Sequence, residues 1–249
     1  MTRQADRVDV PVEALAALAE REQVGRLHVT LRPDPVWRSE TEHDDAAKRV
    51  DDALGVAGLV DERGRATAEL LDWLPLLVHP VLEYYGWVAT GDHTYGVLAA
   101  ASGVQAVLAV SDGDQIGVQE IDRDQVLETL VAQLPAVGPG GGQPRSVRVG
   151  DLTEAARLGA DAHPLDPVLA DVVSLVQRPV HGSGELYAGR RDEVGRYTRL
   201  EEPLHYADTD WGRYLSYTVG AGSDAMIRIS PAGPAELCGA LRELAGGLS

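Results

Sequence analysis

The stretch 104–121, "VQAVLAVSDGDQIGVQEI", decides the fold class. Two runs of β-branched and small apolar residues flank Asp112-Gly113, and an Asp-Gly dipeptide between such runs is a strong signal for a tight β-hairpin. A helix should follow directly, because Asp122 is a good N-cap residue and an apolar stripe comes after it. The stripe consists of Val126, Leu127, Leu130, Val131 and Leu134. The stretch therefore predicts antiparallel strands followed by a helix that covers them.

The residues before this hairpin extend the same pattern toward the N-terminus. Ser39 and Glu42 form a capping-box signature for one helix, and a leucine-rich second helix contains Pro75, which should bend it or shift its start. In chain order we expect helices over 11–22, 39–55 and 66–78, and strands over 81–90, 94–101, 104–111 and 115–121. The order helix, helix, antiparallel strands, helix is typical of an α+β unit.

The same order of elements returns after the segment 135–145, "PAVGPGGGQPR". Asp151 with Glu154 should cap a short helix, Asp166-Pro167 should open another, and Ser230-Pro231 should open the last. Strand-like runs lie between them, at about 181–189, 194–200, 203–207, 212–219 and 224–230. We therefore expect one domain over 1–249 with two internal repeats.

The two repeats are expected over about 39–134 and 150–246, with 135–145 as the linker. Consecutive hairpins imply antiparallel pairing, and helices at both ends of each set of strands imply one covered face. The predicted fold is thus α+β, with duplicated helix–helix–antiparallel meander–helix units that join into one sheet flanked by helical groups, with pseudo-twofold symmetry.

Composition excludes several classes of function. A net charge of −17 and a pI of about 4.7 disfavour nucleic acid and anionic membranes as partners. No run of apolar residues is long enough to insert into a membrane, and residues 1–10 lack the apolar core of a signal peptide, so we expect a cytoplasmic protein. The single cysteine, Cys238, excludes an internal disulfide and any multi-cysteine metal site.

Motifs for catalysis or cofactor binding are weak. The glycine-rich run in 135–145 lacks the Lys-Ser/Thr of a phosphate-binding loop, so a linker explains it better. None of the seven histidines lies in a local zinc pattern, and neither Ser102 nor Ser183 fits a nucleophile elbow. We therefore expect no cofactor.

The stretch 208–215, "DTDWGRYL", admits two interpretations. Asp208 and Asp210 could hold a divalent cation, with His205 nearby as a base, in a metal- or ligand-binding enzyme. Alternatively Asp208 and Thr209 start a turn, and Arg213 neutralises one of the two carboxylates across a structural corner. The structural interpretation is favoured because a local DxD pair is a weak motif.

Several segments resemble the EspG chaperones of actinobacterial type VII (ESX) secretion. The resemblance is carried by "HPVLEYYGWV" after a leucine-rich helix, "VLAVSDGDQIGVQEIDRDQVLETLVAQL", "GELYAGRRDEVGRYTR", "ADTDWGRYLSYTV" and "IRISPAGPAELCGALREL". The sharpest marker is the run acid-Thr-x-x-Gly-Arg-Tyr at 208–214. The resemblance extends over 65–245 and implies a duplicated sheet-and-helix fold.

The resemblance also implies a function. EspG proteins are cytosolic, ATP-independent chaperones without enzymatic activity, and they cover the apolar tip of a secreted helical PPE-like protein, usually in a PE–PPE heterodimer. Their contact surface consists of the hairpin loop after the second strand of the fold, part of the sheet, and C-terminal helices. In this chain the loop is short, "ATGDHT" at 89–94. We therefore expect a monomer or weak homodimer whose partner-binding residues are Thr90, Gly91, Asp92, His93 and Thr94. The expected effect of Gly91→Arg is loss of the partner with an unchanged melting temperature.

Overall fold

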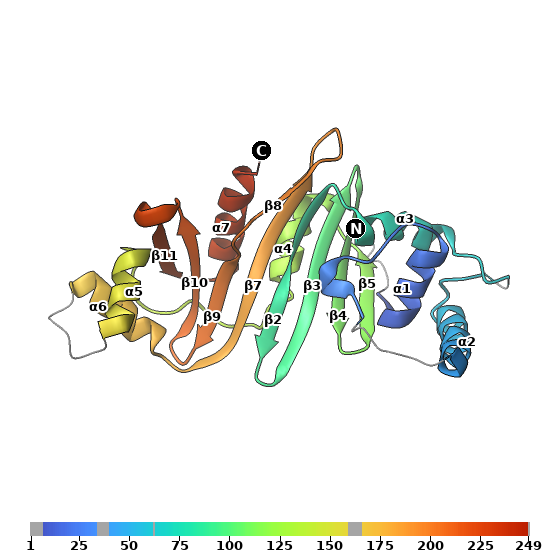
Figure 1. Cartoon of the computed structure of the whole chain (residues 1–249), viewed down its shortest axis with the longest axis horizontal. Coiled ribbons are helices and arrows are strands. Elements are labelled where there is room, and N and C mark those ends of the chain that lie inside the picture. Colours follow the sequence, from blue (N-terminus) through green and yellow to red (C-terminus); the bar gives the residue numbers. More distant parts are fainter. Residues whose placement is uncertain (1–6, 34–39, 62, 159–165, 249) are drawn as a thin grey trace.

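The computed structural model describes residues 7–33, 40–61, 63–158 and 166–248. Within them the strands form one sheet of 11 strands in the order β1-β5-β4-β3-β2-β7-β9-β10-β11-β6, with β8 paired to β7 alone (Figure 1). Every pair of neighbouring strands is antiparallel. The strands are β1 (Val8–Pro11), β2 (Leu82–Thr90), β3 (His93–Ser102), β4 (Gln105–Asp112), β5 (Gln115–Glu120), β6 (Arg145–Arg148), β7 (Val180–Arg191), β8 (Tyr197–Arg199), β9 (Leu204–Thr209), β10 (Gly212–Val219) and β11 (Met226–Pro231).

Helices lie on both faces of this sheet. The described α-helices are α1 (Val12–Arg21), α2 (Glu40–Val56), α3 (Ala68–Val78), α4 (Val126–Val131), α5 (Val149–Leu158), α6 (Pro167–Val176) and α7 (Pro234–Gly246). Helices α4 and α7 cover one face near its middle, whereas α1–α3 and α5–α6 lie at the two ends of the opposite face (Figure 1). The expectation of one covered face is therefore wrong. None of the described helices is long and apolar enough to cross a membrane.

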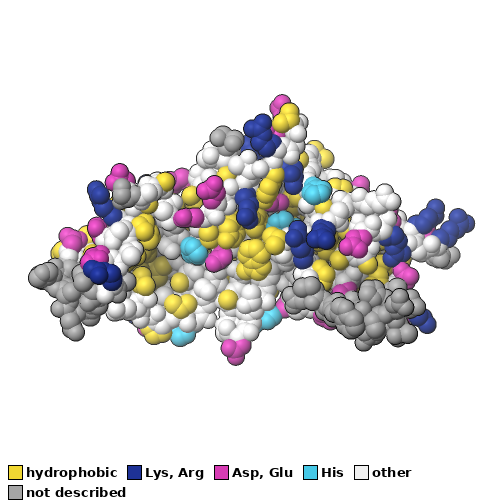
Figure 2. Space-filling model, in the orientation of Figure 1, with side chains coloured by type: hydrophobic (Ala, Val, Ile, Leu, Met, Phe, Trp, Pro, Cys, Tyr) yellow, Lys and Arg dark blue, Asp and Glu magenta, His cyan; other side chains and the backbone are white. Residues whose placement is uncertain are grey.

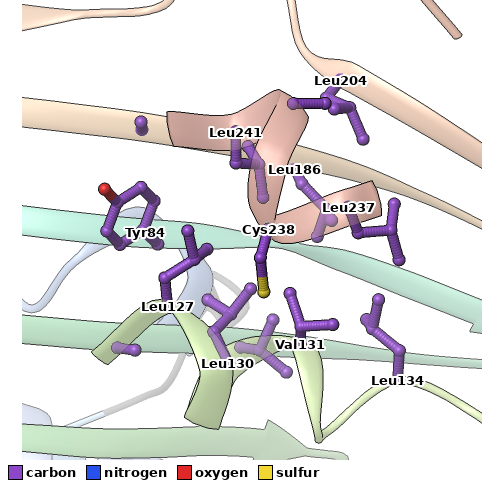
Figure 3. Close-up of a cluster of buried hydrophobic side chains, with 14 of the residues drawn as sticks. Tyr84, Leu127, Leu130, Val131, Leu134, Leu186, Leu204, Leu237, Cys238 and Leu241 are labelled. Carbon is purple, nitrogen blue, oxygen red and sulfur yellow. The ribbon is translucent and has the colours of Figure 1, made fainter. Parts of the chain in front are cut away.

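The two faces follow from the pleat of the central strand β2. Tyr84 and Val88 point to the core under α4 and α7, whereas the intervening Tyr85 packs in the core under α1–α3. Figure 3 shows the first core, in which Cys238 of α7 lies among leucines and valines of α4. Burial raises the pKa of the Cys238 thiol, so this cysteine acts as a small apolar side chain.

The hairpins close as their glycines predict. The β2–β3, β3–β4 and β4–β5 connections are two-residue loops that begin with Gly91, Gly103 and Gly113, at φ of 60°, 58° and 60°. Positive φ is the region that glycine adopts without steric cost. In the opening stretch the strands pair Asp112 with Gln115, so the loop is Gly113-Asp114, one residue later than the Asp-Gly signal.

Most expected elements are present. The strands β1 and β6 were not expected, β8 is shorter than the expected run 194–200, and the other errors concern helix starts. Asp166 caps α6 by accepting from two backbone N–H groups, as expected. Helix α7 begins at Pro234 because Ser230-Pro231 still belongs to β11, and Glu236 accepts a hydrogen bond from the Gly233 N–H. Helix α5 begins at Val149, so Asp151 lies inside its first turn and Glu154 pairs with Arg157. Helix α3 runs through Pro75. The predicted Ser39–Glu42 capping box lies outside the described residues.

The glycine-rich segment 138–142 runs along the start of β10. Gly140 donates its N–H to the Arg213 carbonyl (2.9 Å), and the Arg213 N–H donates to the Gly138 carbonyl (2.8 Å). A Cβ on Gly140 would lie 2.2 Å from the Tyr214 ring, and one on Gly141 would lie 2.4 Å from the Trp211 ring. Glycine is needed here for close approach to two aromatic rings.

Candidate partner-binding surface

In the part of the chain that the structure describes, no helix covers the middle of one sheet face, between the two helical groups α1–α3 and α5–α6. We call this area the central strip. Its floor comes from β2, β7 and β9 and consists of half-buried or exposed side chains, Trp87, Ser183, Glu185, Tyr187, His205 and Ala207. Figure 2 looks onto this face, and hydrophobic side chains gather in its middle with acidic, basic and histidine side chains around them.

Aromatic rings form the apolar part of the central strip. Tyr85 is buried and stacks on Tyr187, with ring centroids 5.1 Å apart and an angle of 8° between the planes. Trp87 meets Tyr187 edge-on, with centroids 6.0 Å apart. Rings that are already packed against one another lose little conformational freedom on binding, so Trp87 and Tyr187 offer a preorganised apolar contact.

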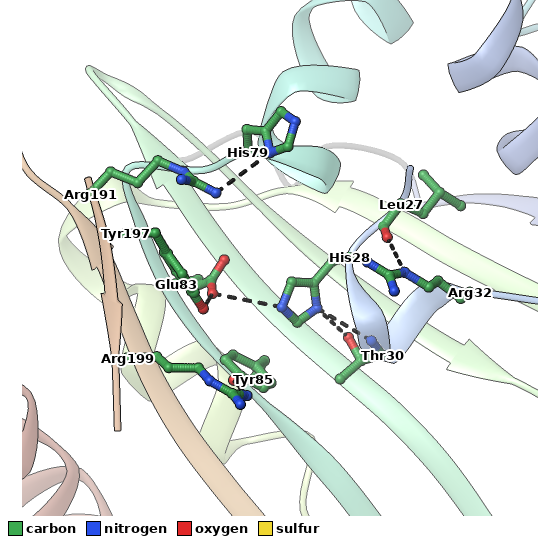
Figure 4. A network of polar contacts seen from close by, with 10 residues as sticks. All are labelled: Leu27, His28, Thr30, Arg32, His79, Glu83, Tyr85, Arg191, Tyr197 and Arg199. Carbon is green, nitrogen blue, oxygen red and sulfur yellow. Dashed lines mark hydrogen bonds and ion pairs between the residues drawn. The ribbon is translucent and has the colours of Figure 1, made fainter. Parts of the chain in front are cut away.

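A buried polar network lies beside these rings and connects three distant segments of the chain (Figure 4). The Glu83 carboxylate, 3% exposed, accepts a hydrogen bond from the Tyr197 hydroxyl of β8 and lies 3.7 Å from His28 Nε2. Burial and this hydrogen bond to Glu83 raise the pKa of Tyr197. Arg199, also in β8, donates to the Tyr85 hydroxyl at 3.2 Å. The network therefore holds β8 and the segment before α2 against β2.

The charged groups of the strip lie in the same row as Trp87. The strand register places Trp87 opposite Glu185 and Glu185 opposite His205. His205 Nδ1 lies 4.0 Å from Glu185 Oε1, and both side chains are about half exposed. The Tyr187 hydroxyl donates to the same carboxylate at 3.3 Å. The strip thus combines apolar rings with one exposed glutamate and one exposed histidine.

The predicted binding residues 90–94 form the β2–β3 turn at the end of the strip, at the bottom of Figure 1. All five are exposed, and His93 Nε2 lies 3.0 Å from an Asp112 carboxylate oxygen across the hairpin. Gly91 has φ of 60°, so any side chain there strains the turn even though open space surrounds it. We therefore now expect Gly91→Arg to lower the melting temperature, whereas the sequence alone suggested no change.

The stretch 208–215 forms a structural corner. Arg213 and Asp208 are 2% and 4% exposed, and the guanidinium donates to both carboxylate oxygens at 2.6 and 2.8 Å. Arg213 also donates to the Pro135 carbonyl (2.8 Å), and its guanidinium lies 4.6 Å from the centre of the Tyr206 ring. The corner therefore attaches the segment after α4 to the second half of the sheet.

The alternative metal site is not assembled. His205 and Asp208 are three residues apart in β9, so their side chains point to opposite faces of the sheet. Asp208 is bound by Arg213, and Asp210, in the β9–β10 turn, is bound by Arg178 at 2.9 and 3.0 Å. Among the described residues, no group of three or more His, Cys, Asp or Glu side chains is arranged to hold a metal ion.

The resemblance implied contact through part of the sheet, but the sequence did not identify the central strip or its residues. The available signal was the alternation within "LEYYGWV" (82–88) and "GELYAG" (184–189). In both segments, every second residue from Glu83 to Trp87 and from Glu185 to Tyr187 is a glutamate or a large aromatic residue, and these residues lie on the same face of the sheet. Alternation alone does not say that this face stays open, because that depends on where the helices pack.

Comparison with known proteins agrees with this architecture. A model of the EspG family matches residues 11–243. The structure is similar to the Mycobacterium tuberculosis type VII secretion system chaperone EspG5, solved in complex with a PE25-PPE41 dimer, with a TM-score of 0.70 and 18% sequence identity over 98% of this chain and 97% of that chain. No curated protein sequence matches the chain significantly. Because the family model extends over nearly the whole fold, the chain belongs to the EspG family.

Proposed function

We propose that this protein is a chaperone of a type VII (ESX) secretion system that binds the apolar tip of a PPE-like protein, in a PE–PPE-type heterodimer, before export. The observation that carries the proposal is the EspG family match over residues 11–243. The fold shared with EspG5, which was solved with a PE25-PPE41 dimer, supports it. A dedicated partner is needed because an exposed hydrophobic tip would otherwise self-associate.

The contact surface that we propose is the central strip together with the turn 90–94. A partner can contact the aromatic rings of the strip without any rearrangement of the hydrophobic cores. The turn adds exposed polar groups at the end of the strip. Apolar groups at the centre and polar groups at the rim are the usual anatomy of a specific interface. We expect the complex to bury about 1,200–2,000 Å² in total.

The protein would act in the cytoplasm, without ATP, as a monomer or weak homodimer. The Gly140 N–H and the Gly138 carbonyl of the glycine-rich segment are bound to Arg213 of β10, so this segment gives no support to a phosphate-binding loop. The enzymatic alternative has no support from His205, Asp208 and Asp210, which do not converge.

We also propose that the chain is a duplication within one domain. Each half has a leading strand, helices, four meander strands and a final helix, and the leading strand pairs with the last strand of its own meander (β1 with β5, β6 with β11). The repeats would then cover 8–131 and 145–246, instead of the 39–134 and 150–246 expected from the sequence, with β8 as an addition to the second. An experimental structure in which the halves do not superpose would count against this proposal.

The function is tested by co-expression with each PE–PPE pair encoded beside ESX genes in the same genome. Size-exclusion chromatography with light scattering should find a complex that contains one copy of each of the three chains. If the protein elutes alone beside every such pair, the chaperone proposal is wrong.

Two matched variants test the surface. Ser183→Arg places a long charged side chain in the middle of the central strip, whereas Gln119→Arg makes the same change at a half-buried position of β5, outside the strip. We expect the first to abolish the complex and the second to preserve it, with circular dichroism verifying that both fold. Asp92→Arg tests the turn without the strain that a change at Gly91 introduces. Equal binding by Ser183→Arg and wild type would exclude the strip as the contact surface.

A further inference from the structure

Glu185 is the acidic side chain at the centre of the central strip. Across the strands, Trp87 of β2 lies opposite it on one side and His205 of β9 on the other. Along β7, Ser183 and Tyr187 are its neighbours on the same face. The Glu185 side chain is 51% exposed, so its carboxylate is in contact with water in the free protein. A partner that covers the strip removes this water.

Glu185 differs from the acids of the corner at 208–215 in having no arginine. Asp208 and Asp210 each lie less than 3.0 Å from a guanidinium nitrogen. Among the residues that the structure describes, no arginine or lysine forms an ion pair with Glu185, and His205 Nδ1 lies 4.0 Å away. The Tyr187 hydroxyl donates to the carboxylate at 3.3 Å, and burial and the Glu185 charge raise the pKa of this tyrosine, so it keeps its proton. The carboxylate is therefore held in position but not neutralised.

The fold does not require an acid at this position. β7 is an interior strand, paired with β2 on one side and with β9 on the other. Glutamate is depleted in strands, where β-branched and aromatic side chains pack better, and two neighbours of Glu185 on this face, Trp87 and Tyr187, are aromatic. The sheet gains little from a carboxylate there, so recognition of a partner explains it better.

This carboxylate discriminates between two kinds of apolar tip. A tip that presents only apolar side chains would cover Glu185 and leave a desolvated charge without a partner, which is strongly unfavourable. A tip that also presents a lysine or arginine forms a charge-assisted hydrogen bond to the same carboxylate. The net charge of −17 attracts a basic group over a longer range as well.

We propose that Glu185 determines which secreted partner this chaperone accepts, by pairing with one lysine or arginine at the partner's tip while apolar residues beside that cation pack on Trp87 and Tyr187. This inference rests on the proposed function. It adds to the apolar contact a requirement for one basic residue within the tip.

The affinity of each purified PE–PPE-type heterodimer encoded beside ESX genes, measured by calorimetry at about pH 8, where histidine is neutral, tests the inference. Glu185→Gln keeps the shape and an acceptor oxygen, so it removes only the charge, and it should raise Kd by about 10-fold or more. Glu193→Gln is the matched control, because it makes the same change at an exposed position between β7 and β8, outside the strip. It should change Kd by less than about twofold.

A double-mutant cycle identifies the group that Glu185 binds. Replacement of the basic tip residue of the partner by methionine should weaken binding to wild type as much as Glu185→Gln does, and should weaken binding to Glu185→Gln little further. Glu185→Lys should reject the natural partner and accept a partner in which that basic residue is replaced by glutamate.

Three results would decide against the inference. If the wild-type protein binds a heterodimer that Glu185→Gln binds equally well, the inference is overturned and the chaperone proposal stands. The same holds if binding tightens as the pH falls from about 8 to about 6 and His205→Gln removes this dependence, because the compensating cation is then His205 rather than a group of the partner. If the wild-type protein binds none of the heterodimers, both proposals are overturned.

Discussion

Replacement of Arg213 by alanine should destabilise the protein strongly, because it leaves the Asp208 carboxylate buried without its cation. The two groups lie on the same face of neighbouring strands, directly opposite in the β9–β10 register, and both are almost completely buried. The perturbation therefore tests whether the sequence 208–215 is a structural element.

The magnitude follows from the contacts that disappear. The variant loses both hydrogen bonds to Asp208 (2.6 and 2.8 Å), the hydrogen bond to the Pro135 carbonyl (2.8 Å) and the contact with the Tyr206 ring. Removal of one partner of a buried ion pair costs about 3–5 kcal/mol, more than the 1–3 kcal/mol expected for a partly buried group. This loss is a large fraction of the roughly 5–15 kcal/mol that stabilises a folded protein.

The chain contains its own control. Arg178 binds Asp210 with the same two-point geometry, at 2.9 and 3.0 Å, but these side chains are partly exposed. Because water screens an exposed pair, Arg178→Ala should cost only about 0–1 kcal/mol. Urea unfolding followed by circular dichroism gives both free energies of unfolding and avoids the tryptophan signal near the corner.

If Arg213→Ala and Arg178→Ala lower the free energy of unfolding by the same amount, within about 1 kcal/mol, burial does not control the strength of the Asp208 pair. The double variant Asp208→Leu/Arg213→Met removes both charges and should be more stable than Arg213→Ala, since an apolar pair leaves no unpaired buried ion.

Three further predictions concern glycine packing, the buried hydrogen bond of a tyrosine, and tyrosine ionisation. Gly140→Ala should cost about 1–3 kcal/mol by overlap with a tyrosine ring of β10, whereas Gly138→Ala, with open space around it, should be tolerated in thermal unfolding. Tyr197→Phe should lower the free energy of unfolding by about 1–3 kcal/mol, because it removes a hydrogen-bond donor from a buried carboxylate. Tyr187→Phe removes a hydroxyl that donates to an exposed carboxylate and should cost less than about 1 kcal/mol. Equal losses of the two variants in urea unfolding would contradict this. Burial raises the pKa of Tyr197 and Tyr206, so the unfolded chain loses these two protons at lower pH than the native protein does. The stability that the two hydroxyl groups contribute is therefore complete below about pH 10 and falls as the pH rises further. Absorbance at 295 nm should find fewer tyrosines ionised near pH 10 in the native protein than in urea.

Local features of the chain were predictable because they depend on neighbours in sequence. The hairpin around Gly113 and the cap at Asp166 are set by backbone conformations and hydrogen bonds within a few residues. The apolar stripe after Asp122 is buried throughout, since a helical period places those side chains on one face. The start of α7 was missed because Ser230-Pro231 has the pattern of a helix start, while pairing with β10 keeps it in a strand.

The candidate surfaces were decided by tertiary structure. Glu83 and Tyr197 are 114 positions apart, and only the pairing of β2 with β7 at the centre of the sheet brings their side chains together. The glycines of 138–142 resemble a flexible linker in sequence, and their packing against Trp211 and Tyr214 gives them a different role. Short-range patterns therefore determined the strands, turns and helices of this protein. Which strip of sheet stays open depends on where helices distant in sequence pack, and that placement minimises exposed apolar area over the whole chain rather than within any one segment.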